Sequence, residues 1–86
     1  MEIVFTAEAK ADIEFFKKAG ERNILKKIRE LVISIDANPF EGLGKPEALK
    51  YDFQGCWSRR INKEHRLVYK ITNKTITIIS TKDHYK

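Results

Sequence analysis

The side chains best suited to chemistry lie in the second half of this 86-residue chain. Glu47 follows a proline, and cations stand after it at Lys50, Arg60 and Arg66. A carboxylate near several cations ionises easily and can act as a general base, while the cations can neutralise an anion. His84 lies near the end of the chain, and histidine both donates and accepts protons near neutral pH. These residues could supply a base, an anion-binding group and an acid.

RNA is a substrate that suits this set, because RNA carries its own nucleophile. Its cleavage needs a base for the 2′-hydroxyl proton, cations for the charge that develops on the phosphate, and an acid for the leaving 5′-oxygen. Tyr85, next to His84, could stack on a base or orient the phosphate. His65 competes with His84 for the role of acid. The sequence shows no cluster of metal ligands, so we expect chemistry without a metal or another cofactor.

Positive charge is unevenly distributed along the chain, whose formal net charge is +5. Residues 1–44 carry seven Lys or Arg against eight Asp or Glu, and residues 45–86 carry ten against four. This basic half predicts a surface that binds a polyanion. Nucleic acid is the first candidate for that partner, and an acidic protein is the second. Two classes of function fit that surface: a nuclease, or a non-catalytic module that binds RNA, DNA or an acidic protein. A basic surface that only keeps the protein soluble is the third reading.

A β-hairpin is the element that must position the arginines. Apolar residues alternate with polar ones on both sides of a polar turn within residues 55–69, which predicts two paired strands with one buried face. If Trp57 faces Tyr69, Arg60 falls opposite Arg66 on the face away from the core. Like charges directly opposite in a sheet cost up to about 1 kcal/mol, so an anionic ligand is the natural reason to place them there.

A further strand is expected before this hairpin. Residues 49–53 alternate apolar and polar side chains, and a three-residue loop with Gly55 would pair Lys50 with Arg60. The three cations Lys50, Arg60 and Arg66 would then form one row across three strands. That row would span roughly 10 Å, because neighbouring strands lie about 4.8 Å apart.

The last strand is expected at about residues 75–81, after a two-residue turn at Asn73-Lys74. This register places Arg66 opposite Thr81. Arg59 does not fit the row of cations, because strict alternation directs its side chain toward the core. We assign Arg59 to an edge or a bulge, where it would bind RNA with Lys50 and Arg60.

The first half of the chain predicts elements that cover the sheet. Residues 2–5 form a short apolar strand that we expect to be buried. Thr6 suits the N-cap of a helix over residues 7–19, and apolar residues at helical spacing predict a second helix over about 21–37. The predicted fold is α+β, an antiparallel sheet with an N-terminal helical hairpin packed on one face, in a single domain over residues 1–86.

Two longer strings carry a resemblance to a known family. The chain reads P-F-E-G-x-G-K-P-E-x-L-K over residues 39–50 and G-x-W-S-R-R-I-x-x-E-H-R-L-V-Y over residues 55–69, and it has His84-Tyr85 near its end. With the helical hairpin before them, these strings are similar to the YoeB/Txe toxins of the RelE superfamily. The match runs nearly end to end.

The resemblance implies a RelE-like fold and a ribosome-dependent endoribonuclease that cuts mRNA in the decoding A site and so inhibits translation. It also implies neutralisation by a YefM/Axe-type antitoxin, binding of operator DNA only as a toxin-antitoxin complex, and frequent homodimers. We expect a cytoplasmic protein, since no apolar run approaches a membrane span, no signal peptide is evident and Cys56 is the single cysteine.

Roles follow from the resemblance by position. Glu47 resembles the family's general base and His84 its general acid. Arg66 resembles the arginine that stabilises the scissile phosphate, and Tyr85 resembles the family's terminal tyrosine. The supporting RNA-binding cations are Lys50 and Arg60.

Overall fold

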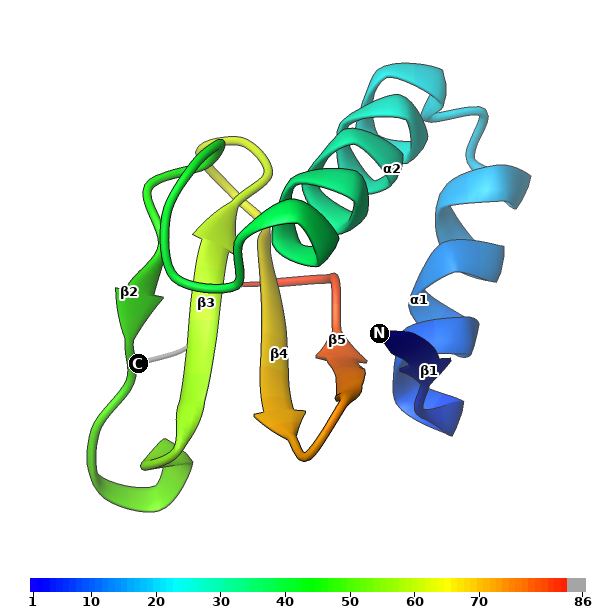
Figure 1. The fold of residues 1–86 in the computed structure, drawn as a ribbon. Coiled ribbons are helices and arrows are strands. Elements are labelled where there is room, and N and C mark those ends of the chain that lie inside the picture. Colours follow the sequence, from blue (N-terminus) through cyan, green and yellow to red (C-terminus); the bar gives the residue numbers. More distant parts are fainter. Residues whose placement is uncertain (84–86) are drawn as a thin grey trace.

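The computed structural model describes residues 1–83, so the candidates His84 and Tyr85 lie outside the described residues. Two helices form a hairpin beside a five-stranded sheet whose strand order is β1-β5-β4-β3-β2 (Figure 1). The elements are β1 (Glu2–Phe5), α1 (Ala7–Lys18), α2 (Arg22–Ala37), β2 (Glu47–Ala48), the 3₁₀ turn η1 (Tyr51–Phe53), β3 (Cys56–Arg60), β4 (Arg66–Thr72) and β5 (Thr75–Ser80). The predicted α+β fold with an N-terminal helical hairpin is confirmed. Neither of the helices within residues 1–83 has the length and apolar character to cross a membrane.

The predicted cap of α1 is present and also ties the helix to the sheet. Thr6 Oγ1 accepts a hydrogen bond from the Ala9 N–H at 3.1 Å, which satisfies one of the free donors of the first turn. The same hydroxyl donates to the Ile79 carbonyl at 2.6 Å. Gly20, at φ +70°, then allows the tight turn into α2.

The core lies between the helices and the face of the sheet that carries Tyr69. Each fully buried aliphatic or aromatic side chain contributes about 1.5–3 kcal/mol through its removal from water. The helices contribute the buried residues of α1 (Ala9 and Phe16) and of α2 (Ile28, Leu31 and Ile35). The buried apolar members of this core are Ala9, Phe16, Ile28, Leu31, Ile35, Ile61, Leu67, Tyr69, Ile76 and Ile78.

The hairpin register predicted from the alternation is confirmed. Trp57 pairs with Tyr69, and Arg60 pairs with Arg66, in antiparallel strands β3 and β4. Burial of Tyr69 on one face fixes this register, because a slip of one residue would exchange the buried and exposed faces. The two arginines therefore stand side by side, as expected.

The strand predicted at residues 49–53 is wrong. Tyr51–Phe53 forms a 3₁₀ turn, in which the Phe53 N–H donates to the Lys50 carbonyl at 3.1 Å and Tyr51 has a φ of +58°. Strand β2 is limited to Glu47–Ala48 and pairs with Ser58 and Trp57 of β3. Lys50 therefore does not pair with Arg60, and the predicted row of three cations does not form. Alternating residue types could not reveal a left-handed backbone at Tyr51.

The pairing of Arg66 with Thr81 is also wrong, because a β-bulge interrupts the register. Tyr69 pairs with Ile78 as predicted, but Val68 pairs with Ser80, so one residue of β5 is skipped. The chain is displaced by one position beyond the bulge. The Arg66 N–H instead donates to the Asp83 carbonyl at 3.1 Å.

The first strand departs from the prediction in direction and in burial. Strand β1 pairs parallel to β5, so the sheet is mixed and not wholly antiparallel. Ile3 and Val4 are 36% and 41% exposed because β1 lies at the edge of the sheet. An edge strand has a neighbour on one side only, and its apolar residues are correspondingly less covered.

Candidate active site

Glu47 and Arg66 come together at the end of the sheet where β2 and β4 begin. They lie at the starts of β2 and β4, the two strands that flank β3. Arg66 Nη1 lies 4.0 Å from Glu47 Oε1, and the side chains are 17% and 68% exposed, respectively. An ion pair at this distance with an exposed carboxylate attracts weakly, by about 0–1 kcal/mol. Glu47 thus remains accessible beside a guanidinium that the protein largely encloses.

A second cation stands beside this pair. Arg60 is the register partner of Arg66, and its side chain is exposed. Within residues 1–83, the Arg60 guanidinium makes no ion pair with a carboxylate. Its backbone N–H donates to the Gly44 carbonyl at 2.7 Å, which fixes the end of β3 against the loop that leads to Glu47. One arginine therefore lies 4.0 Å from the accessible carboxylate, and a second is the neighbour of that arginine in the sheet.

Small and apolar residues continue the register row that begins at Glu47. Glu47 pairs with Ser58, Ser58 pairs with Val68, and Val68 pairs with Ser80, which makes one row across four strands. Ser58, Val68 and Ser80 are almost fully buried, at 1%, 0% and 0% exposed. In the described part of the chain the buried Ser58 Oγ has no hydrogen-bond partner. Beyond Glu47, the side chains of this row are therefore covered and do not offer a surface to a ligand.

Lys50 lies outside this group. It is exposed and follows β2 at the entry to η1, away from the register row of Arg60 and Arg66. A lysine side chain there can still attract a polyanion through its charge. It does not form part of a continuous line of cations.

Arg59 is buried completely, at 0% exposed. Its guanidinium donates five hydrogen bonds within the protein, at distances of 2.7 to 3.2 Å. A guanidinium without accessible surface does not reach an RNA, so the prediction that Arg59 binds RNA is wrong. The alternation of β3 had indicated an inward side chain, and that signal was correct.

The Arg59 guanidinium holds the loop between α2 and β2. Nη1 donates to Leu43 O at 3.0 Å, and Nη2 donates to Asn38 O at 2.7 Å and Glu41 O at 3.0 Å. Gly44 must be glycine here, because a Cβ would lie 3.1 Å from Arg59 Cβ and its φ is +85°. Arg59 therefore positions the segment that continues into Glu47.

The remaining acceptors of Arg59 are hydroxyl groups. Nη1 donates to Ser34 Oγ at 2.7 Å and Nε to Tyr69 Oη at 3.2 Å, and the Tyr69 hydroxyl donates to Pro39 O at 2.6 Å. Burial raises the pKa of the Tyr69 hydroxyl above its ordinary value of 10.0, and this effect outweighs the opposing influence of Arg59. No carboxylate contacts the guanidinium among residues 1–83. Its positive charge is compensated by carbonyl and hydroxyl oxygens.

His65 faces away from Glu47. Its ring is 8% exposed and packs edge-on against Phe16, with 5.1 Å between ring centroids. Its Nδ1 accepts a hydrogen bond from the Asp83 N–H at 2.9 Å. Since neighbouring residues of an extended chain point to opposite faces, the Arg66 side chain reaches the site and that of His65 does not. The structure therefore gives His65 no position from which to act as the acid.

The described residues do not provide a cluster of side chains that could bind a metal ion. In the region that the structure describes, no three His, Cys, Asp or Glu side chains lie close enough to hold an ion together. Cys56 is a free, partly buried thiol. The chemistry that the site offers comes from one carboxylate and two guanidinium groups.

Comparison with known proteins assigns this arrangement to a family. The sequence profile of the YoeB-like toxin of bacterial type II toxin-antitoxin systems matches residues 5–85. The chain belongs to this family. Toxin YoeB of Synechocystis sp. is 45% identical over 86 residues, which cover 100% of this chain and 99% of that toxin. The chain is thus a toxin of a type II toxin-antitoxin system.

Solved YoeB structures share the fold over the whole described sheet. The YoeB/ParE toxin from Agrobacterium tumefaciens matches with a TM-score of 0.94 at 39% identity, over 99% of this chain and 100% of that chain. YoeB from Staphylococcus aureus, 46% identical, has been solved as a dimer and in a heterotetrameric complex with YefM, with TM-scores of 0.89 and 0.88. Both cover 99% of this chain and 98% of the Staphylococcus chain.

Proposed function

We propose that this toxin is a ribosome-dependent endoribonuclease that cleaves mRNA in the decoding A site without a metal ion. The observation that supports this most directly is the accessible Glu47 carboxylate 4.0 Å from Arg66, with Arg60 beside Arg66 in the sheet. A base and two cations are the groups required to activate a 2′-hydroxyl next to a phosphate. The resemblance of the whole chain to YoeB toxins agrees with this chemistry.

The reaction would begin at Glu47. The carboxylate takes the proton of the 2′-hydroxyl, and the 2′-oxygen attacks the adjacent phosphorus. Arg66 and Arg60 stabilise the negative charge that develops on the non-bridging oxygens. The bond to the 5′-oxygen then breaks, and this oxygen takes a proton from an acid. The products are a 2′,3′-cyclic phosphate and a free 5′-hydroxyl.

The acid in this scheme is His84, and Tyr85 orients the phosphate or stacks on a base. Both residues lie outside the described part of the chain, and their roles rest on the resemblance to the family. Histidine suits the acid step because its proton exchanges near neutral pH. Lys50 adds long-range attraction for RNA, together with the other cations that residues 45–86 carry in excess, ten Lys or Arg against four Asp or Glu.

The cellular partners follow from the same proposal. We expect a YefM/Axe-type antitoxin to neutralise the toxin in the cytoplasm, since the related S. aureus toxin has been solved in complex with YefM. The S. aureus dimer supports a homodimer of this chain. Operator DNA would be bound only by the toxin-antitoxin complex, and the ribosome would present the mRNA.

The decisive experiment uses ribosomes programmed with a defined mRNA. The toxin should cut the mRNA in the A site, and the 5′ ends can be mapped by primer extension. Glu47→Gln keeps the size of the side chain and removes the base, so it should bind ribosomes and lose cleavage by about 10²-fold or more. Ribosome binding without any cleavage by the unmodified chain would instead support a non-catalytic RNA-binding module.

A further inference from the structure

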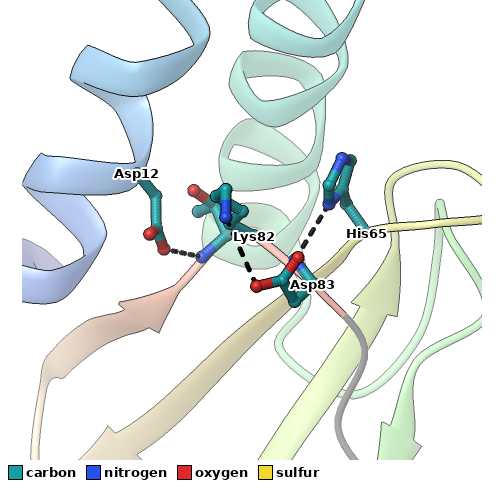
Figure 2. Close-up of polar contacts among 5 residues, drawn as sticks. Asp12, His65, Lys82 and Asp83 are labelled. Carbon is teal, nitrogen blue, oxygen red and sulfur yellow. Dashed lines mark hydrogen bonds and ion pairs between the residues drawn. The ribbon is translucent and has the colours of Figure 1, made fainter.

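The segment after β5 is anchored to two distant parts of the chain. Thr81 is fully buried, and its N–H donates to Asp12 Oδ2 of α1 at 2.8 Å. Two residues later, the Asp83 N–H donates to His65 Nδ1 at 2.9 Å. Figure 2 shows Asp12 and His65 reaching this segment from opposite sides. The segment is thus fixed at both ends by side chains from other elements.

Asp83 is held by both of its backbone groups. Its N–H meets the imidazole of His65, and its carbonyl accepts the Arg66 N–H at 3.1 Å. Its φ of +67° is a conformation that residues other than glycine rarely adopt. Two hydrogen bonds from consecutive residues therefore maintain an unusual turn at the point where the chain continues to His84.

Other contacts also hold the imidazole of His65 in place, independently of its bond to Asp83. The Asn62 side-chain oxygen accepts the N–H groups of Glu64 and His65 at 2.9 and 2.8 Å, which fixes the turn between β3 and β4. The His65 ring packs against Phe16 of α1. Nδ1 accepts the Asp83 N–H through the lone pair in the plane of the ring.

The other polar contact of the segment contributes less. Lys82 Nζ lies 3.4 Å from Asp83 Oδ2, and these side chains are 30% and 76% exposed. An exposed pair between neighbouring residues is weak and easily replaced by water. The anchoring of the Asp83 backbone therefore depends on His65 and on the Arg66 N–H.

We propose that His65 is a positioning residue for cleavage. By accepting the Asp83 N–H, it fixes the backbone that leads into His84 relative to Arg66, its own neighbour in sequence. Asp83, the residue before the proposed acid, is thereby held to the backbone of Arg66, the proposed phosphate-binding arginine, while His65 itself touches no substrate. The catalytic part of this inference rests on the proposed function, and the anchoring of Asp83 does not.

Two variants separate the hydrogen bond from the packing of the ring. His65→Asn keeps an acceptor close to the position of Nδ1 and loses the ring. His65→Phe keeps the ring and loses the acceptor. Circular dichroism checks folding, and His65→Leu replaces His65→Phe if the latter does not fold.

The first measurement is hydrogen exchange at the Asp83 amide in the free protein. Exchange should accelerate about 10-fold or more in His65→Phe, because the amide loses its acceptor, and should stay near that of the unmodified chain in His65→Asn. Equal protection in all three proteins would overturn the anchor. This measurement decides the anchor even if the chain does not cleave RNA.

The second measurement is cleavage of mRNA on programmed ribosomes. His65→Phe should lower kcat by about 10²-fold with little change in KM, since a displacement of about 1 Å has this effect on reacting groups. His65→Asn should restore most of kcat. Full activity of His65→Phe, or equal loss in both variants, would contradict the positioning role. A lack of cleavage by the unmodified chain would overturn the proposed function and the catalytic part of this inference together.

Discussion

At the scale of single residues, the site depends on how Arg66 is placed. Its side chain is only 17% exposed, yet it stands 4.0 Å from Glu47 and beside Arg60. A guanidinium that is already oriented stabilises charge without first rearranging. Arg66 is therefore the cation that we expect to matter most for cleavage.

Arg66→Ala should reduce mRNA cleavage by about 10²-fold or more, the usual effect of removing one donor to a developing charge. The fold should persist, because the side chain is not part of the apolar core. Cleavage assays on programmed ribosomes and circular dichroism test both statements. Arg60→Ala, the exposed neighbour, should cause a smaller loss. A folded Arg66→Ala protein with normal cleavage would remove Arg66 from the mechanism.

Tyr69 should make the protein sensitive to alkaline pH. Burial raises the pKa of its hydroxyl above 10.0. The unfolded chain then loses this proton at lower pH than the folded chain, so the contribution to stability is complete below pH 10 and is lost as pH rises through the folded pKa. Tyr69→Phe should show a shallower decline in melting temperature above pH 10. Tyr51→Phe is the control, since Tyr51 is 90% exposed.

Residue types and alternation predicted the central part of this site correctly. They placed Arg60 opposite Arg66 because Trp57 and Tyr69 needed a common buried face. They did not predict the role of Arg59, because its acceptors are mostly carbonyls, which every residue possesses. A sequence does not show which carbonyls will converge on one side chain.

At the scale of elements, the loop between α2 and β2 is organised around Arg59. Its guanidinium bonds to carbonyls at Asn38, Glu41 and Leu43, which follow the end of α2. These carbonyl oxygens accept hydrogen bonds from the buried guanidinium and so compensate its charge. The loop is thus fixed without an acidic partner for Arg59 in the described residues.

Arg59→Lys should lower the free energy of unfolding by about 2–4 kcal/mol, since an ammonium group cannot reach acceptors spread over a planar fork. Urea denaturation followed by circular dichroism measures this loss. Arg60→Lys is the matched control: its side chain is exposed, and the change should be within about 0.5 kcal/mol. Similar losses in both variants would mean that burial of Arg59 is not the cause.

Truncation after Asp83 should separate the fold from the activity. Deleting residues 84–86 leaves every described member of the apolar core in place, so the shortened chain should fold and still bind ribosomes. Loss of a general acid costs about 10²–10⁴-fold in rate, and cleavage should fall accordingly. Co-sedimentation and cleavage assays compare the two chains. Retained cleavage would show that neither His84 nor Tyr85 is needed.

Elements with strong periodicity were predicted well, and irregular ones were not. Thr6 capped α1 as expected because a side-chain acceptor at the first turn is a local signal. The turn at Tyr51 and the bulge after Val68 were missed. Both depend on how distant segments fit together, and neither is visible in local residue types.

At the scale of the whole molecule, the basic surface should govern association. Residues 45–86 carry ten Lys or Arg against four Asp or Glu, and an acidic antitoxin segment would neutralise this excess. The affinity for the antitoxin should therefore fall as salt rises, because ions screen charges over about 10 Å at 0.1 M. Calorimetry at several NaCl concentrations measures this. We expect the antitoxin to cover the site around Glu47 and Arg66. An affinity independent of salt, or a complex that leaves Arg60 and Arg66 exposed, would contradict this expectation.

The parallel pairing of β1 with β5 has a consequence for the timing of synthesis. Strand β1 precedes the other described strands, yet it pairs with β5, the last of them, and Thr6 bonds to Ile79 across 73 positions. Contacts between such distant residues form late, because the chain between them must first be closed into a loop. The nascent chain therefore cannot complete its sheet until β5 has left the ribosome. A chain whose proposed target is the ribosome therefore keeps an incomplete sheet while the residues before β5 are being made.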